Sequence, residues 1–160
     1  MIIWLKLTRP ANMNKGETGE SVFADTSAFY ALMDRSDANH EEAATIWTYL
    51  SEKEFLLVTT NYVVLETTAL LQNRLGFDAA NLWYKDVFGL AEIFWINESL
   101  QRQAYEIWAA MELRRLSLTD CVSFTVMRNC QIKRVFCFDR HFEDQGFEII
   151  CGNFNTGGLK

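Results

Sequence analysis

Residues 22–25 read V-F-A-D, and residues 135–139 read V-F-C-F-D. Each stretch is a short apolar run rich in β-branched or aromatic residues, which is typical of a buried strand, and each ends in an aspartate. Three further runs of the same kind occupy residues 55–59, 93–96 and 147–150. We therefore predict five short strands.

Helical patterns fill the segments between these runs. Apolar side chains recur at helical spacing over residues 61–75, which Gly76 ends, and in segments that begin at Asp78 and Ser99. Two motifs resemble capping boxes that begin further helices, Asn39-x-x-Glu42 and Ser117-x-x-Asp120. Strands separated by helices need crossover connections, so we expect a three-layer α/β/α sandwich with a mainly parallel central sheet.

Composition favours one folded domain. The 160 residues are 49% hydrophobic, which excludes intrinsically disordered and collagen-like chains. We expect the domain to span residues 21–150, between a flexible arm (1–20) and a flexible tail (151–160). No run of about 18 uncharged apolar residues and no convincing export signal occur, so we expect no membrane contact and a cytoplasmic location.

Charge and cysteine spacing argue against two classes of protein, those that coat nucleic acid and those that bind zinc. The net charge of −6 argues against a protein that coats nucleic acid through bulk positive charge, although residues 101–140 carry seven basic and four acidic side chains. No C-x-x-C pair exists, and the two histidines lie far apart in sequence, so a zinc site is unsupported. Free cysteines within apolar runs indicate a reducing compartment.

Four acids are expected to meet at one edge of the sheet. Asp25 and Asp139 follow predicted strands, Glu66 lies early in the helix after the second strand, and Asp120 lies in the first turn of its own helix. In open α/β sheets the functional crevice lies beyond the carboxyl ends of the strands. Each acid alone has a simpler interpretation, since aspartates commonly cap helices.

Clustered carboxylates repel one another unless they take up protons or bind a cation. Oxygen ligands suit Mg²⁺ or Mn²⁺, which polarise phosphoryl oxygens and lower the pKa of bound water. The sequence therefore predicts a metal-dependent phosphodiesterase centre.

Four ordered segments carry a family resemblance: F-A-D-T-S-A-F-Y-A-L (23–32), T-N-Y-V-V-L-E-T (60–67), L-S-L-T-D-C-V-S-F (116–124) and V-F-C-F-D-R-H-F-E-D-Q-G-F (135–147). They resemble the acidic motifs of the PIN domain, and in particular those of VapC-like toxins. The resemblance covers roughly residues 21–150 and leaves residues 1–20 outside it.

The resemblance implies a Mg²⁺- or Mn²⁺-dependent endoribonuclease, the toxin of a type II toxin-antitoxin pair. Asp25 and Asp120 would be the main metal ligands, Glu66 would hold the metal or its waters, and Asp139 would complete the acidic ring. Ser27 and Thr119 would supply supporting hydrogen bonds, and we expect Asp144 to be a solvated loop residue. The implied partners are an RNA substrate, an antitoxin protein and a second copy in a homodimer.

Several alternatives stay open or are weakened. A housekeeping RNA-processing nuclease and a PIN-like module that binds RNA or protein without cleavage both fit the motifs. Two other α/β families fit poorly. A haloacid-dehalogenase phosphatase needs a second aspartate where Ser27 stands, and a receiver domain needs an acidic pair at the first strand, which here offers one acid. Glycine-rich phosphate loops do not occur, so nucleotide binding of the P-loop or Rossmann kind is unsupported.

A set of aromatic residues has two possible roles, packing in the core or contact with a partner at an interface. The set comprises Trp83, Tyr84, Phe88, Phe94, Trp95 and Trp108.

Overall fold

A computed structural model describes residues 20–152 of the chain. Nearly all of the expected arm and tail therefore lie outside the described residues. The elements follow in the order β1 (Ser21–Ala24), α1 (Thr26–Met33), α2 (His40–Glu52), β2 (Leu56–Thr60), α3 (Asn61–Leu75), α4 (Phe77–Leu90), β3 (Glu92–Phe94), α5 (Glu98–Met111), α6 (Leu118–Asn129), β4 (Arg134–Phe136), α7 (His141–Asp144) and β5 (Glu148–Ile149).

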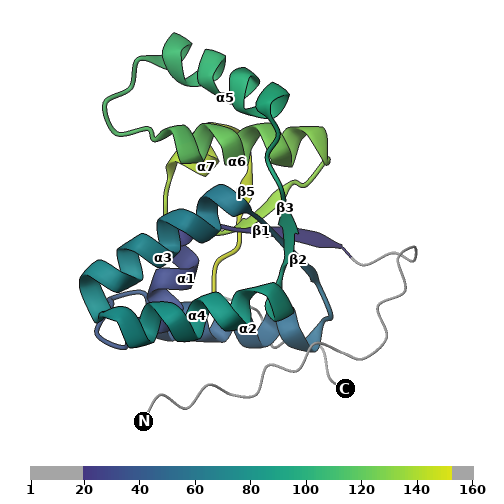
Figure 1. Ribbon diagram of the computed structural model, residues 1–160. Helices are drawn as coiled ribbons and strands as arrows, with labels where there is room; N and C mark the ends of the chain where they lie inside the picture. The colour runs from purple at the N-terminus through teal and green to yellow at the C-terminus, as the bar shows by residue number, and fades with distance from the viewer. Residues whose placement is uncertain (1–19, 153–160) are drawn as a thin grey trace, which may run out of the picture.

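The sheet has five strands in the order β3-β2-β1-β4-β5, and every neighbouring pair is parallel. Figure 1 shows α5, α6 and α7 above the strands and α2 and α4 below them, so helices flank the sheet on two sides. Strand β1 is central and its side chains from Val22 to Ala24 are fully buried. The expected α/β/α architecture with a parallel sheet is confirmed.

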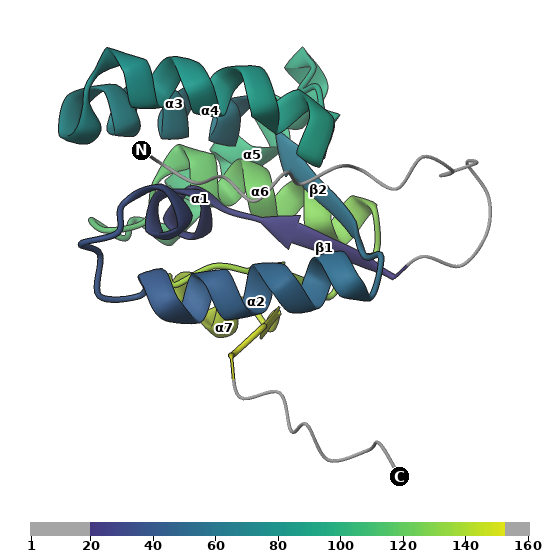
Figure 2. The ribbon, with the colours of Figure 1, turned by 90° about the horizontal axis from the view of Figure 1, so that it is seen from below.

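Helix packing places three elements around the carboxyl end of β1. Helix α1 packs against α2 and α3, and α3 packs in turn against α6. Helices α3 and α4 run side by side (Figure 2), joined at Gly76, whose φ of 92° is readily adopted by glycine. Residues of α1, α3 and α6 therefore converge at the end of the central strand.

The structure corrects several local predictions. Asn39 stands at the N-cap of α2, but its side chain makes no capping hydrogen bond there. Strand β4 ends at Phe136, so Asp139 follows after a two-residue gap. Helices α1 and α7 were not predicted, and α7 ends with the exposed Asp144 that we expected in a loop. Within residues 20–152, no helix combines the length and apolarity needed to cross a membrane.

Candidate active site

Asp25 anchors the site at the end of the central strand. It is the N-cap of α1, where its Oδ2 accepts hydrogen bonds from the backbone N–H (3.1 Å) and the hydroxyl (2.8 Å) of Ser27. The hydroxyl oxygen of Ser27 accepts in turn from the backbone N–H of Phe138 at 3.0 Å. Ser27 thus fixes the Asp25 carboxylate and ties α1 to the segment that leads from β4 to Asp139.

Asp120 is held by the capping box at the start of α6. Its backbone N–H donates to the hydroxyl of Ser117 at 3.0 Å, and its Oδ2 accepts from the backbone N–H of Ser117 at 2.8 Å. The predicted cap is confirmed. Because both bonds fix the first turn of the helix, the Asp120 side chain has a defined direction.

Glu66 is oriented by the residue that follows Asp25. The hydroxyl of Thr26 donates to Glu66 Oε2 at 2.7 Å, and the hydroxyl of Thr67 donates to Thr26 Oγ1 at 3.2 Å. Glu66 is half-buried near the start of α3. These bonds bring the third acid to the N-terminal end of α1, beside Asp25.

Asp139 follows β4 and lies beside Asp120. Its Oδ1 accepts from the backbone N–H of His141 at 2.9 Å, and His141 Nδ1 lies 3.2 Å from the same oxygen. Ligand atoms of Asp120, Asp139 and His141 all lie within 4.8 Å of one another. Asp25 and Glu66 are not members of this close group.

The electrostatics link Asp25 to the same cluster. Burial raises the pKa of Asp25 to about 6, against the lowering effect of its Ser27 hydrogen bonds, and the charge of Asp120 raises it further. Burial likewise raises the pKa of Asp120, and the charge of Asp139 adds to the rise. The charge of Asp120 therefore acts on Asp25, and the charge of Asp139 acts on Asp120.

Each of the four acids keeps one oxygen available. The chain holds Oδ2 of Asp25 and Asp120, Oε2 of Glu66 and Oδ1 of Asp139. The structure shows no hydrogen bond from any described residue to the second oxygen of these carboxylates. Oxygen ligands that are oriented but unsaturated fit a hard divalent cation such as Mg²⁺ or Mn²⁺.

The supporting residues differ in their contacts. Ser27 makes the contacts expected of it. Thr119 contributes its backbone carbonyl to the hydroxyl of Ser123 at 3.0 Å, and its own hydroxyl has no hydrogen-bond partner among the residues described. Thr26 and His141 were not among the predicted site residues, although both lie within the quoted motifs, one residue after Asp25 and two after Asp139.

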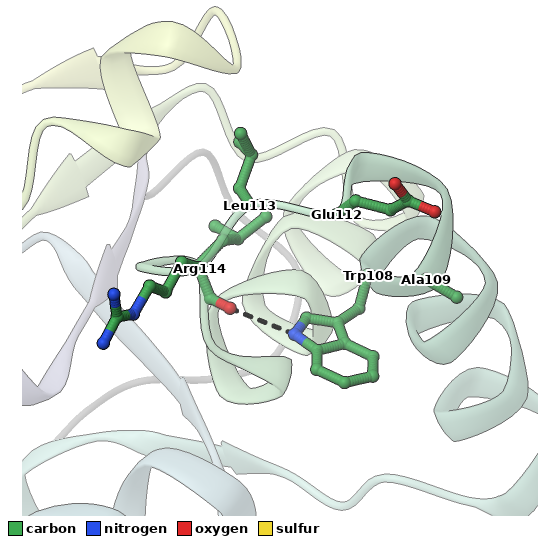
Figure 3. A pocket seen from close by; sticks show the side chains of 6 residues that line it. Trp108, Ala109, Glu112, Leu113 and Arg114 are labelled. Carbon is green, nitrogen blue, oxygen red and sulfur yellow. Dashed lines mark hydrogen bonds between the residues drawn. The ribbon is translucent and has the colours of Figure 1, made fainter.

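A hollow of about 350 Å³ lies apart from the acids (Figure 3). It is lined by Trp108, Ala109, Glu112, Leu113, Arg114 and Leu116. The indole N–H of Trp108 donates to the carbonyl of Leu116 at 3.0 Å, which fastens the end of α5 to the segment before α6. The hollow contains none of the four acids.

A protein-family model matches most of the chain. The model of the PIN domain matches residues 22–148. The chain belongs to the PIN domain family. The expected resemblance is thereby confirmed, and the PIN match spans every element that carries a candidate acid.

Curated PIN relatives extend the comparison. The chain is 32% identical over 127 residues to VapC20 of Mycobacterium tuberculosis, named a 23S rRNA-specific endonuclease, in strains CDC 1551 / Oshkosh and ATCC 25618 / H37Rv. This alignment covers 79% of the chain and 95% of the relative. The crystal structure of M. tuberculosis VapC20, described as a Sarcin-Ricin loop cleaving toxin, matches with a TM-score of 0.75 and 31% identity. It covers 82% of this chain and 99% of that one.

Proposed function

We propose that the chain is a Mg²⁺- or Mn²⁺-dependent endoribonuclease and the toxin of a type II toxin-antitoxin pair. The observation that carries the proposal is the convergence of acids from separate motifs, with Asp120 and Asp139 in one close group and Asp25 coupled to Asp120. Membership of the PIN family and the likeness to VapC20 support the same activity. RNA is the substrate, and the chain acts in the cytoplasm.

In this proposal the chain's own residues orient the acids for hydrolysis. Ser27 fixes Asp25, the Ser117 cap fixes Asp120, and Thr26 directs Glu66, so each carboxylate is set before substrate arrives. Asp25, Asp120, Glu66 and Asp139 would hold the metal. When bound, a divalent cation polarises a phosphoryl oxygen and lowers the pKa of a bound water. Glu66 would help accept a proton from the attacking water.

Basic side chains near the acids in sequence suit an RNA backbone. Arg114 and Arg115 lie just before the Ser117 cap, and Arg140 directly follows Asp139. All three are exposed, and none forms an ion pair with a residue between 20 and 152. Free arginines bind phosphates without sequence preference, so they would hold the RNA strand across the acidic centre.

Exposed aromatic side chains support a protein partner. Two members of the aromatic set belong to the interior: Trp83 is buried in the core, and the partly buried Phe94 packs against the core. The other four are exposed, namely Tyr84, Phe88, Trp95 and Trp108. Aromatic residues are enriched at interfaces. We propose that exposed side chains of this set contact a second copy in a homodimer or an antitoxin, and an inhibitor would place an arginine or lysine in the acidic site. Sedimentation of wild type and Trp95→Ser tests the dimer: a monomeric wild type would contradict it.

The activity is tested with purified full-length protein and RNA. After EDTA treatment, wild type is incubated with total RNA with and without Mg²⁺ or Mn²⁺, and the ends are mapped by sequencing. We expect discrete cleavage only with metal, no cleavage by Asp120→Asn, and full cleavage by Asp144→Asn, which removes an exposed acid. Cleavage in EDTA, or by Asp120→Asn at the wild-type rate, would refute the assignment.

Two competing functions make different predictions. A non-cleaving binding module would show no metal-dependent products. A housekeeping nuclease would cleave, but its induction would not arrest growth, and no short upstream gene for a DNA-binding antitoxin would accompany it. We expect growth arrest that Asp120→Asn abolishes.

A further inference from the structure

We infer that His141 is a nitrogen ligand of the metal at the acidic site, and that it makes the site prefer Mn²⁺ over Mg²⁺. This inference rests on the proposed metal-dependent function and adds a residue to it. The four acids alone offer only oxygen, which does not distinguish the two ions strongly.

His141 is turned back onto the acid that precedes it. It is the first residue of α7, and its backbone N–H donates to Asp139 Oδ1 at 2.9 Å. The imidazole Nδ1 lies 3.2 Å from the same oxygen, and only 26% of the side chain is exposed. One short turn therefore presents a carboxylate and an imidazole to the same place.

The Nδ1 atom of His141 is buried yet has no hydrogen-bond partner among residues 20–152. A buried polar atom without a partner costs free energy, so such atoms are rare in folded proteins. The chain's other histidine is the natural comparison: Nδ1 of His40 lies 2.7 Å from the carbonyl oxygen of Ala31 and is hydrogen-bonded to it. Of the two histidines, only His141 has a buried nitrogen without a hydrogen-bond partner among residues 20–152; the other such nitrogens there are the indole Nε1 atoms of Trp47 and Trp83, which cannot bind a metal while they carry their protons.

Distances in the close group suit a shared ion. An octahedral ion with bonds of about 2.1 Å places neighbouring ligand atoms about 3.0 Å apart and opposite ones about 4.2 Å apart. The ligand atoms of Asp120, Asp139 and His141 all lie within 4.8 Å of one another, and Nδ1 is 3.2 Å from Asp139 Oδ1. Small side-chain adjustments bring all three within reach of one ion.

A simple His141–Asp139 ion pair does not account for this arrangement. In such a pair Nδ1–H would donate to Oδ1, but the 3.2 Å separation lacks hydrogen-bond alignment. Oδ1 already accepts the backbone N–H of His141. Asp139 Oδ2, which accepts no hydrogen bond from residues 20–152, is the oxygen that would bind the ion beside Nδ1 of His141.

A nitrogen ligand changes the choice of metal. Mg²⁺ binds oxygen and water and loses its hydration reluctantly, whereas affinity for nitrogen-containing sites rises from Mn²⁺ through the later transition metals. We expect the wild-type site to bind Mn²⁺ more tightly than Mg²⁺, and His141→Asn to reduce this preference by about tenfold. Titration of Mg²⁺ against bound Mn²⁺ measures the ratio of the two dissociation constants.

Pulsed electron paramagnetic resonance of the full-length chain loaded with Mn²⁺ reports the ligand directly. We expect modulation from a coordinated ¹⁴N in wild type, its loss in His141→Asn with Mn²⁺ still bound, and its retention in the matched control His40→Asn. Urea unfolding of each variant verifies that it is folded.

Two results would overturn the inference in distinguishable ways. Bound Mn²⁺ in wild type without nitrogen coupling would remove His141 from the ligands and leave the nuclease proposal intact. No Mn²⁺ bound to wild type, together with no metal-dependent cleavage, would overturn both proposals.

Discussion

Asp25→Asn is expected to make the metal-free protein more stable while abolishing its activity. The side chain is 4% exposed, and burial raises its pKa from 3.8 to about 6. Between these values the unfolded chain has released the proton that the folded chain still holds, so the free energy of unfolding falls as pH rises. At about 1.36 kcal/mol per pKa unit, the loss is about 3 kcal/mol at pH 8.

The asparagine substitution removes this penalty without removing the cap. Its carbonyl oxygen can accept both hydrogen bonds that Ser27 donates, and asparagine is as good an N-cap residue as aspartate. We therefore expect the free energy of unfolding to rise by about 1 to 3 kcal/mol at pH 8. At pH 4.5 the gain in the free energy of unfolding that comes from removing the Asp25 charge falls to about 1 kcal/mol, since most folded molecules are then protonated at Asp25.

The assay is urea unfolding in EDTA, followed by tryptophan fluorescence at pH 8 and pH 4.5. Asp144→Asn is the matched control, because it removes an exposed carboxylate and should change stability by less than about 0.5 kcal/mol. A pH-independent difference, or an Asp25→Asn variant less stable than wild type at pH 8, would show that the buried Asp25 carboxylate does not destabilise the metal-free protein.

Two other substitutions test the residues that orient the acids. Ser27→Ala removes the hydroxyl that bonds Asp25 and leaves the Phe138 N–H without its acceptor, so we expect a loss of about 1 to 3 kcal/mol in urea unfolding and slower RNA cleavage; unchanged stability would contradict this role. Thr26→Val removes the 2.7 Å bond to Glu66 but keeps the side-chain volume, so we expect cleavage to slow by about tenfold with little change in KM. A wild-type rate would show that Glu66 needs no orientation by Thr26.

Much of the candidate site's geometry could be predicted because its acids occupy positions with a simple structural meaning. Asp25 follows a short apolar run that is typical of a buried strand, and the Ser117–Asp120 motif predicts its own capping geometry. In a parallel sheet such positions share one edge, so convergence follows from topology. The parallel arrangement of all five strands follows from the same alternation of strands and helices.

Other features depend on packing that a linear pattern does not encode. Helix α1 is buried on several sides, at Ala28, Phe29, Ala31 and Met33, so it lacks the one-sided periodicity that identifies an amphipathic helix. The predicted capping box at Asn39 does not form. The backbone N–H of Asn39, which Glu42 would accept in such a box, donates to the side chain of Asp37 instead. Asn39 also has a ψ of 4° rather than the extended backbone of a typical N-cap residue. The approach of His141 to Asp120 depends on where α6 and α7 meet, which spacing does not reveal.

The central claim is that acids from separate motifs hold one divalent cation. Anomalous diffraction from crystals soaked in Mn²⁺ tests it most directly. We expect a Mn²⁺ peak in contact with carboxylate oxygens of Asp25, Asp120 and Asp139, and no peak there in Asp120→Asn. A wild-type crystal whose Mn²⁺ peaks all lie away from these carboxylates would contradict it.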